Sequence, residues 1–236
     1  MPITPDDRVD RAFLRLHVEA GWGVPVPPLG GVERVALVPE SRRPPWSLYV
    51  ARVGDTYIEI VPHGAHASAR QAARLRDALA RDPAATGDAS VYREVVLRLA
   101  DAAPAPVVAT VVAPFTVRRV ARHELALMES FDVGAASYYL LAPDRAPVFA
   151  VIAGGRVLAV AHSSRRGAEA CELGIETRPE ARRRGYALAL ARLWSAAVLA
   201  EGLAPIYSAS ASNTASLALA AAAGYRIAAR AAYLLG

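Results

Sequence analysis

The feature that most constrains the fold is a strand that runs through a basic turn into a long helix. Residues 171–177 alternate Cys, Leu, Ile and Thr with Glu, Gly and Glu, which is the period of a strand with two different faces. Pro179 ends this run. An Ala/Leu-rich segment over 186–201 predicts a helix that Gly202 stops. A strand followed at once by a helix is typical of an α/β fold.

The turn between this strand and this helix has the composition of an anion site. The first N–H groups of a helix have no partners within the helix, and the helix dipole places partial positive charge there. Three consecutive arginines, Arg182 to Arg184, precede the helix, and Gly185 and Ala187 keep its start small. The spacing differs from the Walker and dinucleotide glycine motifs, so nucleoside triphosphate and NAD sites are poorly supported. The turn predicts a binding site for another phosphorylated ligand.

The rest of the C-terminal half predicts a mixed sheet flanked by helices. Gly154-Gly155 favours a tight hairpin between two strands, Asn213 is placed to cap a helix, and Gly224 is placed to end it. The expected order is β-α-β-β-β-α-β-α-β. Its elements are strands at 116–120, 148–152, 156–163, 171–177, 205–209 and 225–235, and helices at 122–131, 186–201 and about ten residues from Asn213.

The N-terminal half predicts a smaller α/β domain. It shows no phosphate-binding turn of its own, so a supporting or substrate-shaping role is expected. A boundary near Pro114 divides the chain into domains 1–114 and 115–236. The predicted elements are helices at 5–20, 68–82 and 90–100, and strands at 35–38, 47–53, 57–61 and 107–112.

Charge and composition exclude several classes of protein. Residues 1–114 hold 13 Arg and 13 acidic residues, whereas residues 115–236 hold 14 Arg and 9 acidic residues, so the whole net charge of +5 falls in the second half. This favours a local anionic partner. The chain lacks the interleaved aromatic and basic residues typical of nucleic-acid binding. It also shows neither a secretory signal nor an apolar run long enough to cross a membrane, so a cytoplasmic protein is expected.

The turn and the segments after it resemble the GNAT acetyltransferase superfamily over about residues 116–236. Arg182-x-x-Gly185-x-Ala187 is similar to the family's pyrophosphate loop. The order and separation of the later motifs are also similar, and they resemble most the branch that includes zwittermicin-resistance-type acetyltransferases. The segments that carry this likeness are 172–180, 202–205, 213–220 and Gly224-Tyr225.

The resemblance implies a GNAT-like fold, acetyl-CoA as cosubstrate and an acyltransferase activity. It implies that the backbone of Ile175 receives the acetyl carbonyl and that the backbone of Thr177 pairs with the pantetheine arm, with Glu176 between them. Asn213 and Ser216 would line the pantetheine side of the cleft. The pyrophosphate would lie against Arg182, Arg183, Arg184, Gly185, Tyr186 and Ala187.

The expected mechanism is direct attack of a primary amine on the thioester. Glu172 is the candidate base, acting directly or through a water that bare Gly174 would admit between Glu172 and Glu176. Two departures from the family pattern stand out. Ala220 occupies the place of the usual tyrosine general acid, and a seventh strand after Tyr225 is missing, so the N-terminal half or a second subunit would complete the sheet.

Other interpretations are open. A non-catalytic acyl-CoA-binding sensor would keep the binding site without the chemistry. The pair His63-x-x-His66 lacks further ligands at metal spacing, so no metal is expected. Cys171 fits a core position, and His162 lies in no nucleophile motif. The acceptor, a small-molecule or peptide amine, is not identified, and a homodimer is a further expectation.

Overall fold

A computed structural model describes residues 5–35, 44–81, 88–100, 111–112 and 115–234. The chain divides into two compact units, each described by itself. Unit 1 comprises 1–98, 206–220 and 225–236, and unit 2 comprises 99–205 and 221–224. The expected boundary near Pro114, most of the strand expected at 107–112 and the end of the strand expected at 35–38 lie outside the described residues.

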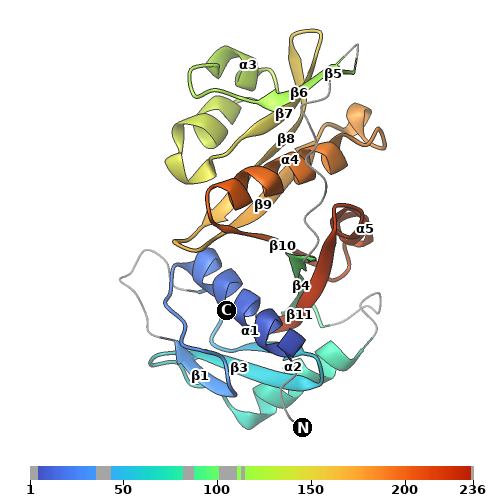
Figure 1. Cartoon of the computed structure of the whole chain (residues 1–236). Helices are drawn as coiled ribbons and strands as arrows, with labels where there is room; N and C mark the ends of the chain where they lie inside the picture. The colour runs from blue at the N-terminus through green and yellow to red at the C-terminus, as the bar shows by residue number, and fades with distance from the viewer. Residues whose placement is uncertain (1–4, 36–43, 82–87, 101–110, 113–114, 235–236) are drawn as a thin grey trace. The chain divides into compact units, whose positions relative to one another are not determined.

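Unit 2 contains an antiparallel sheet in the order β9-β8-β7-β6-β5 (Figure 1). The hairpin between β7 and β8 turns at Gly154 and Gly155, whose φ angles of 56° and 74° confirm the predicted tight turn. The strands are β5 (Val111–Val112), β6 (Phe115–Arg119), β7 (Phe149–Ala153), β8 (Arg156–Arg166) and β9 (Ala170–Thr177).

Helices cover both faces of this sheet. Helix α4 (Tyr186–Ala200) contacts β7, β8 and β9. It ends where the N–H groups of Gly202 and Leu203 bond to the carbonyls of Leu199 and Val198, the arrangement that a C-terminal glycine favours. The opposite face carries α3 (Leu125–Glu129), a π-helical turn η2 (Ala136–Leu141) and a 3-10 turn η3 (Pro143–Arg145).

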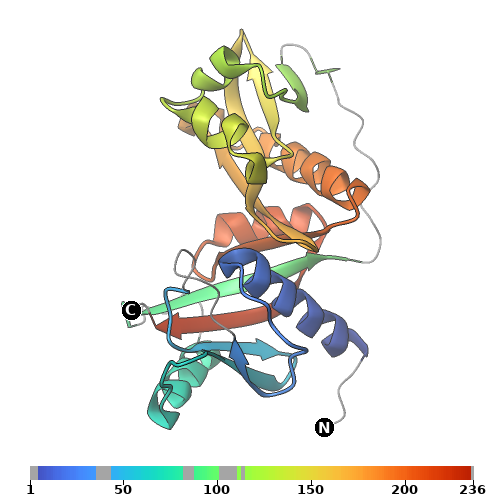
Figure 2. The ribbon, with the colours of Figure 1, turned by 90° about the vertical axis from the view of Figure 1, so that its left-hand side faces the viewer.

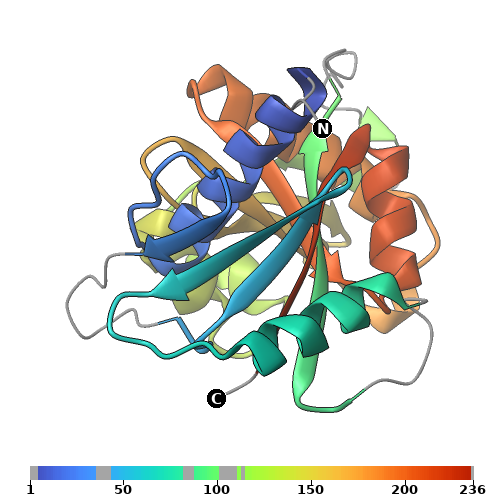
Figure 3. The same ribbon diagram turned by 90° about the horizontal axis from the view of Figure 1, so that it is seen from below.

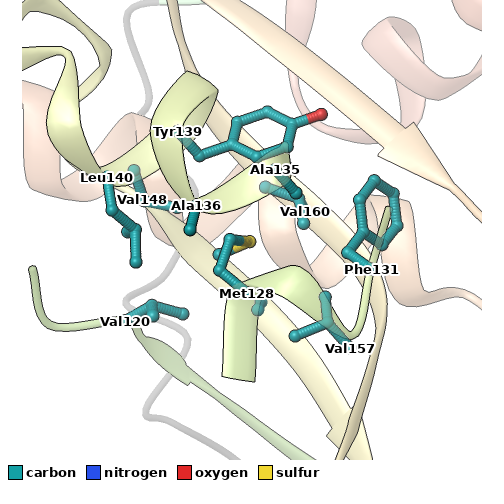
Figure 4. Close-up of a cluster of buried hydrophobic side chains, with 11 residues drawn as sticks. Val120, Met128, Phe131, Ala135, Ala136, Tyr139, Leu140, Val148, Val157 and Val160 are labelled. Carbon is teal, nitrogen blue, oxygen red and sulfur yellow. The ribbon is translucent and has the colours of Figure 1, made fainter. Parts of the chain in front are cut away.

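The core on the α3 side is a cluster of small and aromatic residues (Figure 4). Met128 is fully buried between strands β7 and β8 and the turn η2. Tyr139 covers the cluster with its ring, and its hydroxyl points away from the apolar side chains. The helix expected at 122–131 is shorter than predicted, and the sequence did not predict η2 or η3.

Unit 1 contains a mixed sheet in the order β1-β3-β2-β11-β4-β10. Strands β1 and β3 are parallel, whereas β3–β2, β2–β11 and β4–β10 are antiparallel. Together with the flanking helices, this confirms the predicted fold class. The strands are β1 (Val32–Val35), β2 (Tyr49–Val53), β3 (Thr56–Pro62), β4 (Val91–Leu99), β10 (Ala204–Ser210) and β11 (Tyr225–Leu234).

The two N-terminal helices cover opposite faces of this sheet (Figure 3). Helix α1 (Pro5–Trp22) places Trp22 against Tyr49 and Tyr233, with ring centroids 5.8 and 6.3 Å away. Helix α2 (Ala69–Ala80) buries Leu75 against a cluster that includes Val50 and Ala232, the strand neighbours of those tyrosines. Successive strand residues thus face different helices.

The helix predicted at 90–100 is wrong, because this segment forms β4. Six consecutive residues, 94–99, are buried, so burial does not alternate along the strand. The charged residues Glu94 and Arg98 are buried too, because they bond to Tyr49 and Asp10. In the strand order β4 lies between β11 and β10, and it runs beside β11 in Figure 2. The N-terminal half therefore supplies the strand that the C-terminal half lacks.

Candidate functional site

Arg178 fixes the start of the turn between β9 and α4. Its Nε donates to the carbonyl of Val157 at 3.1 Å, and its Nη2 donates to the carbonyls of Ser130, at 2.6 Å, and Phe131. These bonds tie the end of β9 to β8 and to the segment after α3. The sequence analysis missed this residue because its partners lie 21 to 48 residues away.

The turn itself has the geometry expected for an anion. Arg183 and Gly185 have left-handed φ angles of 64° and 79°. Gly185 is the N-cap of α4, which receives no side-chain cap, so its first N–H groups are left for another partner. A Cβ on Gly185 would meet no atom within 4 Å. The glycine therefore leaves open space above the helix start, and this arrangement fits a phosphate group.

The charged side chains of the turn are also free to contact an anion. Arg182, Arg183 and Arg184 are exposed, and Arg182 Nε donates to the carbonyl of Thr177 at 3.4 Å. Arginines at a helix N-terminus repel the helix dipole unless an anion lies between them. Tyr186 points inward, with its ring 4.9 Å from that of Phe115, so only its backbone remains for a ligand.

The backbone groups of Ile175 and Thr177 point away from β8. These residues stand opposite Ala161 and Ala159, and the N–H of Arg178 bonds to the carbonyl of Leu158. Hydrogen-bonded pairs alternate with other pairs along an antiparallel ladder. The pairs at 175 and 177 are therefore the ones without mutual bonds, and their N–H and C=O groups face the opposite edge of β9, as the predicted pairing with an extended ligand requires.

Glu172, Gly174 and Glu176 lie on one face of β9, as predicted. Glu172 is 6% exposed, and its carboxylate lies 3.4 Å from the Arg165 guanidinium. Glu176 is exposed and accepts a hydrogen bond of 2.6 Å from the hydroxyl of Tyr139. The same bond and burial of the phenol raise the pKa of Tyr139, burial having the larger effect.

The expected water site beside Gly174 is wrong. A Cβ on Gly174 would lie 2.6 Å from Cε1 of His162 and closer still to its Nε2. The imidazole therefore fills the place left by the missing side chain. A lone glycine inside a strand signals close approach of another group, and this signal could have led the sequence analysis to His162.

Two cavities in unit 2 adjoin these residues. One, of about 520 Å³, is lined by Glu176, Thr177 and Arg182, among others. The other, of about 430 Å³, is lined by Tyr139, by residues 119–122 and by the η2–η3 segment. Because Tyr139 lines one cavity and Glu176 the other, their hydrogen bond joins the two walls.

The other two predicted cofactor residues belong to unit 1. Asn213 Oδ1 accepts from the N–H of Ser216 at 3.0 Å, which confirms the predicted cap of α5 (Thr214–Ala222). The Ser216 hydroxyl lies 2.8 Å from that of Tyr207. Ala220 is fully buried, so no side chain at this position reaches a ligand in the way the family's tyrosine does.

Metal-ligand clusters and the lone cysteine are the other features that bear on chemistry. Among the residues that the structure describes, no group of three His, Cys, Asp or Glu side chains could hold a metal ion. Cys171 is buried, and burial raises the pKa of its thiol, as expected for a core position. Within the same residues, no helix is both long and apolar enough to span a bilayer.

Comparison with known proteins gives one family match in the C-terminal half of the chain. The family model described as GNAT acetyltransferase matches residues 145–232, a segment that includes β9, the basic turn, α4 and α5. No curated protein matches the sequence. This match agrees with the resemblance that the sequence predicts, over the segment 145–232.

Several solved structures are similar to this chain. A GCN5-related N-acetyltransferase-like protein from Streptococcus suis is 16% identical, and the match covers 99% of this chain and 100% of that one with a TM-score of 0.50. It shows the shared fold. A putative GNAT acetyltransferase from Novosphingobium aromaticivorans is 24% identical over 62% of this chain, with a TM-score of 0.46. One from Colwellia psychrerythraea is 18% identical over 68%, with a TM-score of 0.48. The match spans only 65% and 61% of the latter two proteins.

Proposed function

We propose that the protein transfers the acetyl group of acetyl-CoA to a primary amine of a small-molecule or peptide acceptor. The observation that carries this proposal is the turn from Arg182 to Ala187. It combines an uncapped helix start, open space at Gly185 and three exposed arginines. The pyrophosphate of a CoA thioester is the anion that the family match suggests for this site.

The chain's own residues would then bind and orient the reactants. The turn would hold the pyrophosphate. Contact of Asn213 and Ser216 with the pantetheine arm stays a prediction from the sequence. The N–H of Ile175 would hold the thioester carbonyl oxygen as a small oxyanion site, while the backbone of Thr177 pairs with the arm. Bound acetyl-CoA supplies a carbonyl carbon open to direct attack by a neutral amine, without a covalent enzyme intermediate.

The sequence predicts Glu172 as the base. Its carboxylate faces the same side as Gly174, where an amine would approach the thioester, but it is largely buried and already paired with Arg165. Its role stays a prediction. The resemblance to zwittermicin-resistance-type acetyltransferases, the cytoplasmic location and the homodimer also stay predictions.

A second candidate is a non-catalytic acyl-CoA-binding sensor. The buried Ala220 favours it, because the family's usual general acid is missing there. Both candidates require acetyl-CoA binding, and only the enzyme releases free thiol when an amine is added.

The proposal predicts that acetyl-CoA stabilises the chain. At about 100 times its Kd a ligand adds roughly 2.7 kcal/mol, which for a chain of this length raises the Tm by about 5–10 °C. The measurement is thermal unfolding of protein freed of bound CoA, with adenosine as a control that lacks the pyrophosphate. An unchanged Tm at millimolar acetyl-CoA would contradict the proposal.

Thiol release then separates enzyme from sensor. Acetyl-CoA is mixed with the protein and one amine at a time: spermidine, kanamycin, L-lysine and a short peptide with a free N-terminus. Release of CoA above the rate without amine identifies the enzyme. Stabilisation by acetyl-CoA without release for any amine favours the sensor.

A further inference from the structure

The residue that carries a further inference is His162, in the middle of β8. Its side chain is almost completely buried, at 2% exposed. The rings of Tyr139 and Tyr138 pack edge-on against it, with centroids 4.9 and 5.7 Å away. The imidazole is therefore held in one position by its neighbours.

One contact fixes the form of the neutral ring. Nδ1 lies 3.0 Å from the carbonyl oxygen of Ser163. A carbonyl oxygen only accepts, so Nδ1 carries the proton of the neutral imidazole. Nε2 is then the nitrogen with the free lone pair, and the ring can accept a proton only there.

Nε2 lies directly against β9. It occupies the place where residue 174 would carry a Cβ, and only a glycine leaves that place open. Within the described part of the chain, no group forms a hydrogen bond to Nε2. A basic nitrogen of a buried side chain thus lies beside the strand whose next residue, Ile175, turns its backbone groups to the opposite edge.

The surroundings keep the ring neutral yet able to take a proton. Burial lowers the pKa of His162, and it outweighs the bond to Ser163, which raises the pKa. Arg145 of η3 lowers the pKa further, whereas Glu176 of β9 and Asp144 of η3 raise it, and the phenols of Tyr138 and Tyr139 pack against the ring. An imidazole that is neutral near pH 7 is suited to act as a general base.

We propose that His162, rather than Glu172, is the general base of the transfer and that its Nε2 accepts the proton of the acceptor amine, directly or through one water. This inference rests on the proposed acetyl transfer. As the amine nitrogen bonds to the carbonyl carbon, the C–S bond breaks and sulfur leaves with the electron pair. The proton moves from nitrogen to Nε2, and solvent later exchanges it from His162 to the thiolate.

The two candidate bases differ in their partners in the protein without substrate. Glu172 is matched by the guanidinium of Arg165 at 3.4 Å, so its charge is engaged before any substrate arrives. Nε2 of His162 is not engaged by any described group. The assignment also gives a reason for Gly174, since any other residue there would push the ring from its place.

The first test needs no substrate. Long-range ¹H–¹⁵N NMR spectra of the full chain without substrate report the tautomer and the titration of this ring. The signals of His162 are identified by their absence in His162→Gln. The proposal requires a proton on Nδ1 and a midpoint below the ordinary value of 6.5. A neutral ring protonated on Nε2, or one that does not titrate above pH 4, would overturn the proposal whether or not the protein is an enzyme.

The second test compares pH profiles of kcat/KM with the fastest amine of the thiol-release panel. We expect His162→Gln to lower kcat/KM about 100-fold, a typical contribution of a general base, and to remove the low-pH limb. Acetyl-CoA affinity should stay within about twofold, because the ring packs on Tyr138, Tyr139 and Gly174, none of which is assigned to cofactor binding. His123→Gln, at an exposed histidine of the same unit, is the matched control and should leave the profile unchanged.

Two further variants separate a base from a structural role. His162→Asn retains a donor near Nδ1 and removes Nε2, so it should keep the Tm within a few degrees while losing activity like His162→Gln. Gly174→Ala should displace the ring and lower kcat without changing the acetyl-CoA Kd. If Glu172→Gln removes the low-pH limb and both His162 variants retain it, the inference is wrong and the proposed function stands. If the wild type neither binds acetyl-CoA nor releases thiol, the proposed function is wrong.

Discussion

Gly185 is the residue at which the phosphate site can be tested most directly. Its φ of 79° disfavours any side chain, by roughly 1–2 kcal/mol, and a side chain there would also enter the space left for a phosphate. Gly185→Val should therefore lose both stability and acetyl-CoA binding. Gly155→Val is the matched control, because Gly155 has a φ of 74° and equally open surroundings but lies in the β7–β8 hairpin.

Calorimetric titration with acetyl-CoA and thermal unfolding of both variants check this prediction. Each should lose a similar amount of stability, and only Gly185→Val should lose binding. Equal acetyl-CoA affinity in the two variants would show that the turn from Arg182 to Ala187 does not bind the pyrophosphate.

Glu124 gives a prediction about stability against pH. Two hydrogen bonds from Arg118, at 2.6 and 2.8 Å, and one from the N–H of Ala121 lower its pKa from 4.5 to about 2, those from Arg118 having the larger effect. A lowered pKa stabilises the folded state above the unfolded value and ceases to do so as the pH falls through the folded value. The stabilisation is thus complete above pH 4.5 and lost between about 4.5 and 2.

Glu124→Gln should therefore cost about 1 kcal/mol at pH 7, since the pair is partly exposed, and nothing near pH 2. Urea unfolding at a series of pH values measures this difference. Glu180→Gln, at a carboxylate that is 61% exposed and 3.7 Å from Arg178, should show a much smaller dependence. A constant difference between Glu124→Gln and wild type over this range would contradict the cause given for the pKa.

At the scale of elements, the N-cap of α5 tests whether Asn213 has a second role. Loss of the bond from Asn213 to the N–H of Ser216 should cost about 1 kcal/mol in Asn213→Ala. Ser68→Ala is the matched control, because Ser68 caps α2 in the same unit through an equivalent bond to Gln71. Both variants should lose similar stability, and only Asn213→Ala should raise the KM for acetyl-CoA several-fold. A KM unchanged in both would leave Asn213 as a cap alone.

Elements with their own local signals were predictable from the sequence. Glycines at the ends of α4 and α5, the Gly154-Gly155 hairpin and the Asn213 cap each act through bonds within a few residues. The predicted β9, turn and α4 therefore agree closely with the structure. Strand β4 was not predictable in this way, because its partners β10 and β11 lie more than 100 residues away. Its charged residues Glu94 and Arg98 are buried through bonds to Tyr49 and Asp10, which the local sequence does not indicate.

The same limit explains what the site analysis missed. The turn from Arg182 to Ala187 acts through its own backbone, so its geometry could be predicted. His162 and Arg178 act through groups on other elements, since His162 fills the place beside Gly174 and Arg178 bonds to Val157 and Ser130. Both residues can be read from the sequence, but their contacts cannot be predicted from it. These contacts depend on the register of β8 and β9 and on the position of η2.

At the scale of the whole molecule, we infer from the strand order that the two sequence halves fold together. In unit 1 the C-terminal strands β10 and β11 pair with β4 and β2 of the N-terminal half, at residues 206–210 with 94–98 and at 230–233 with 49–52. Without these partners, buried strand edges would expose unpaired N–H and C=O groups, which costs free energy at each one.

The fragment 115–236 should therefore fail to fold alone, although the family resemblance covers this segment. We expect it to be insoluble or to unfold without a cooperative transition, while fragments 1–114 and 115–236 produced together should associate and regain one. Circular dichroism melting and size-exclusion chromatography of each fragment and of the pair measure this. The full chain is the control for cooperativity, and its acetyl-CoA-dependent rise in Tm should return only in the pair. A cooperative, acetyl-CoA-stabilised fragment 115–236 would show that β4 is dispensable and that the sequence boundary near Pro114 separates independent domains.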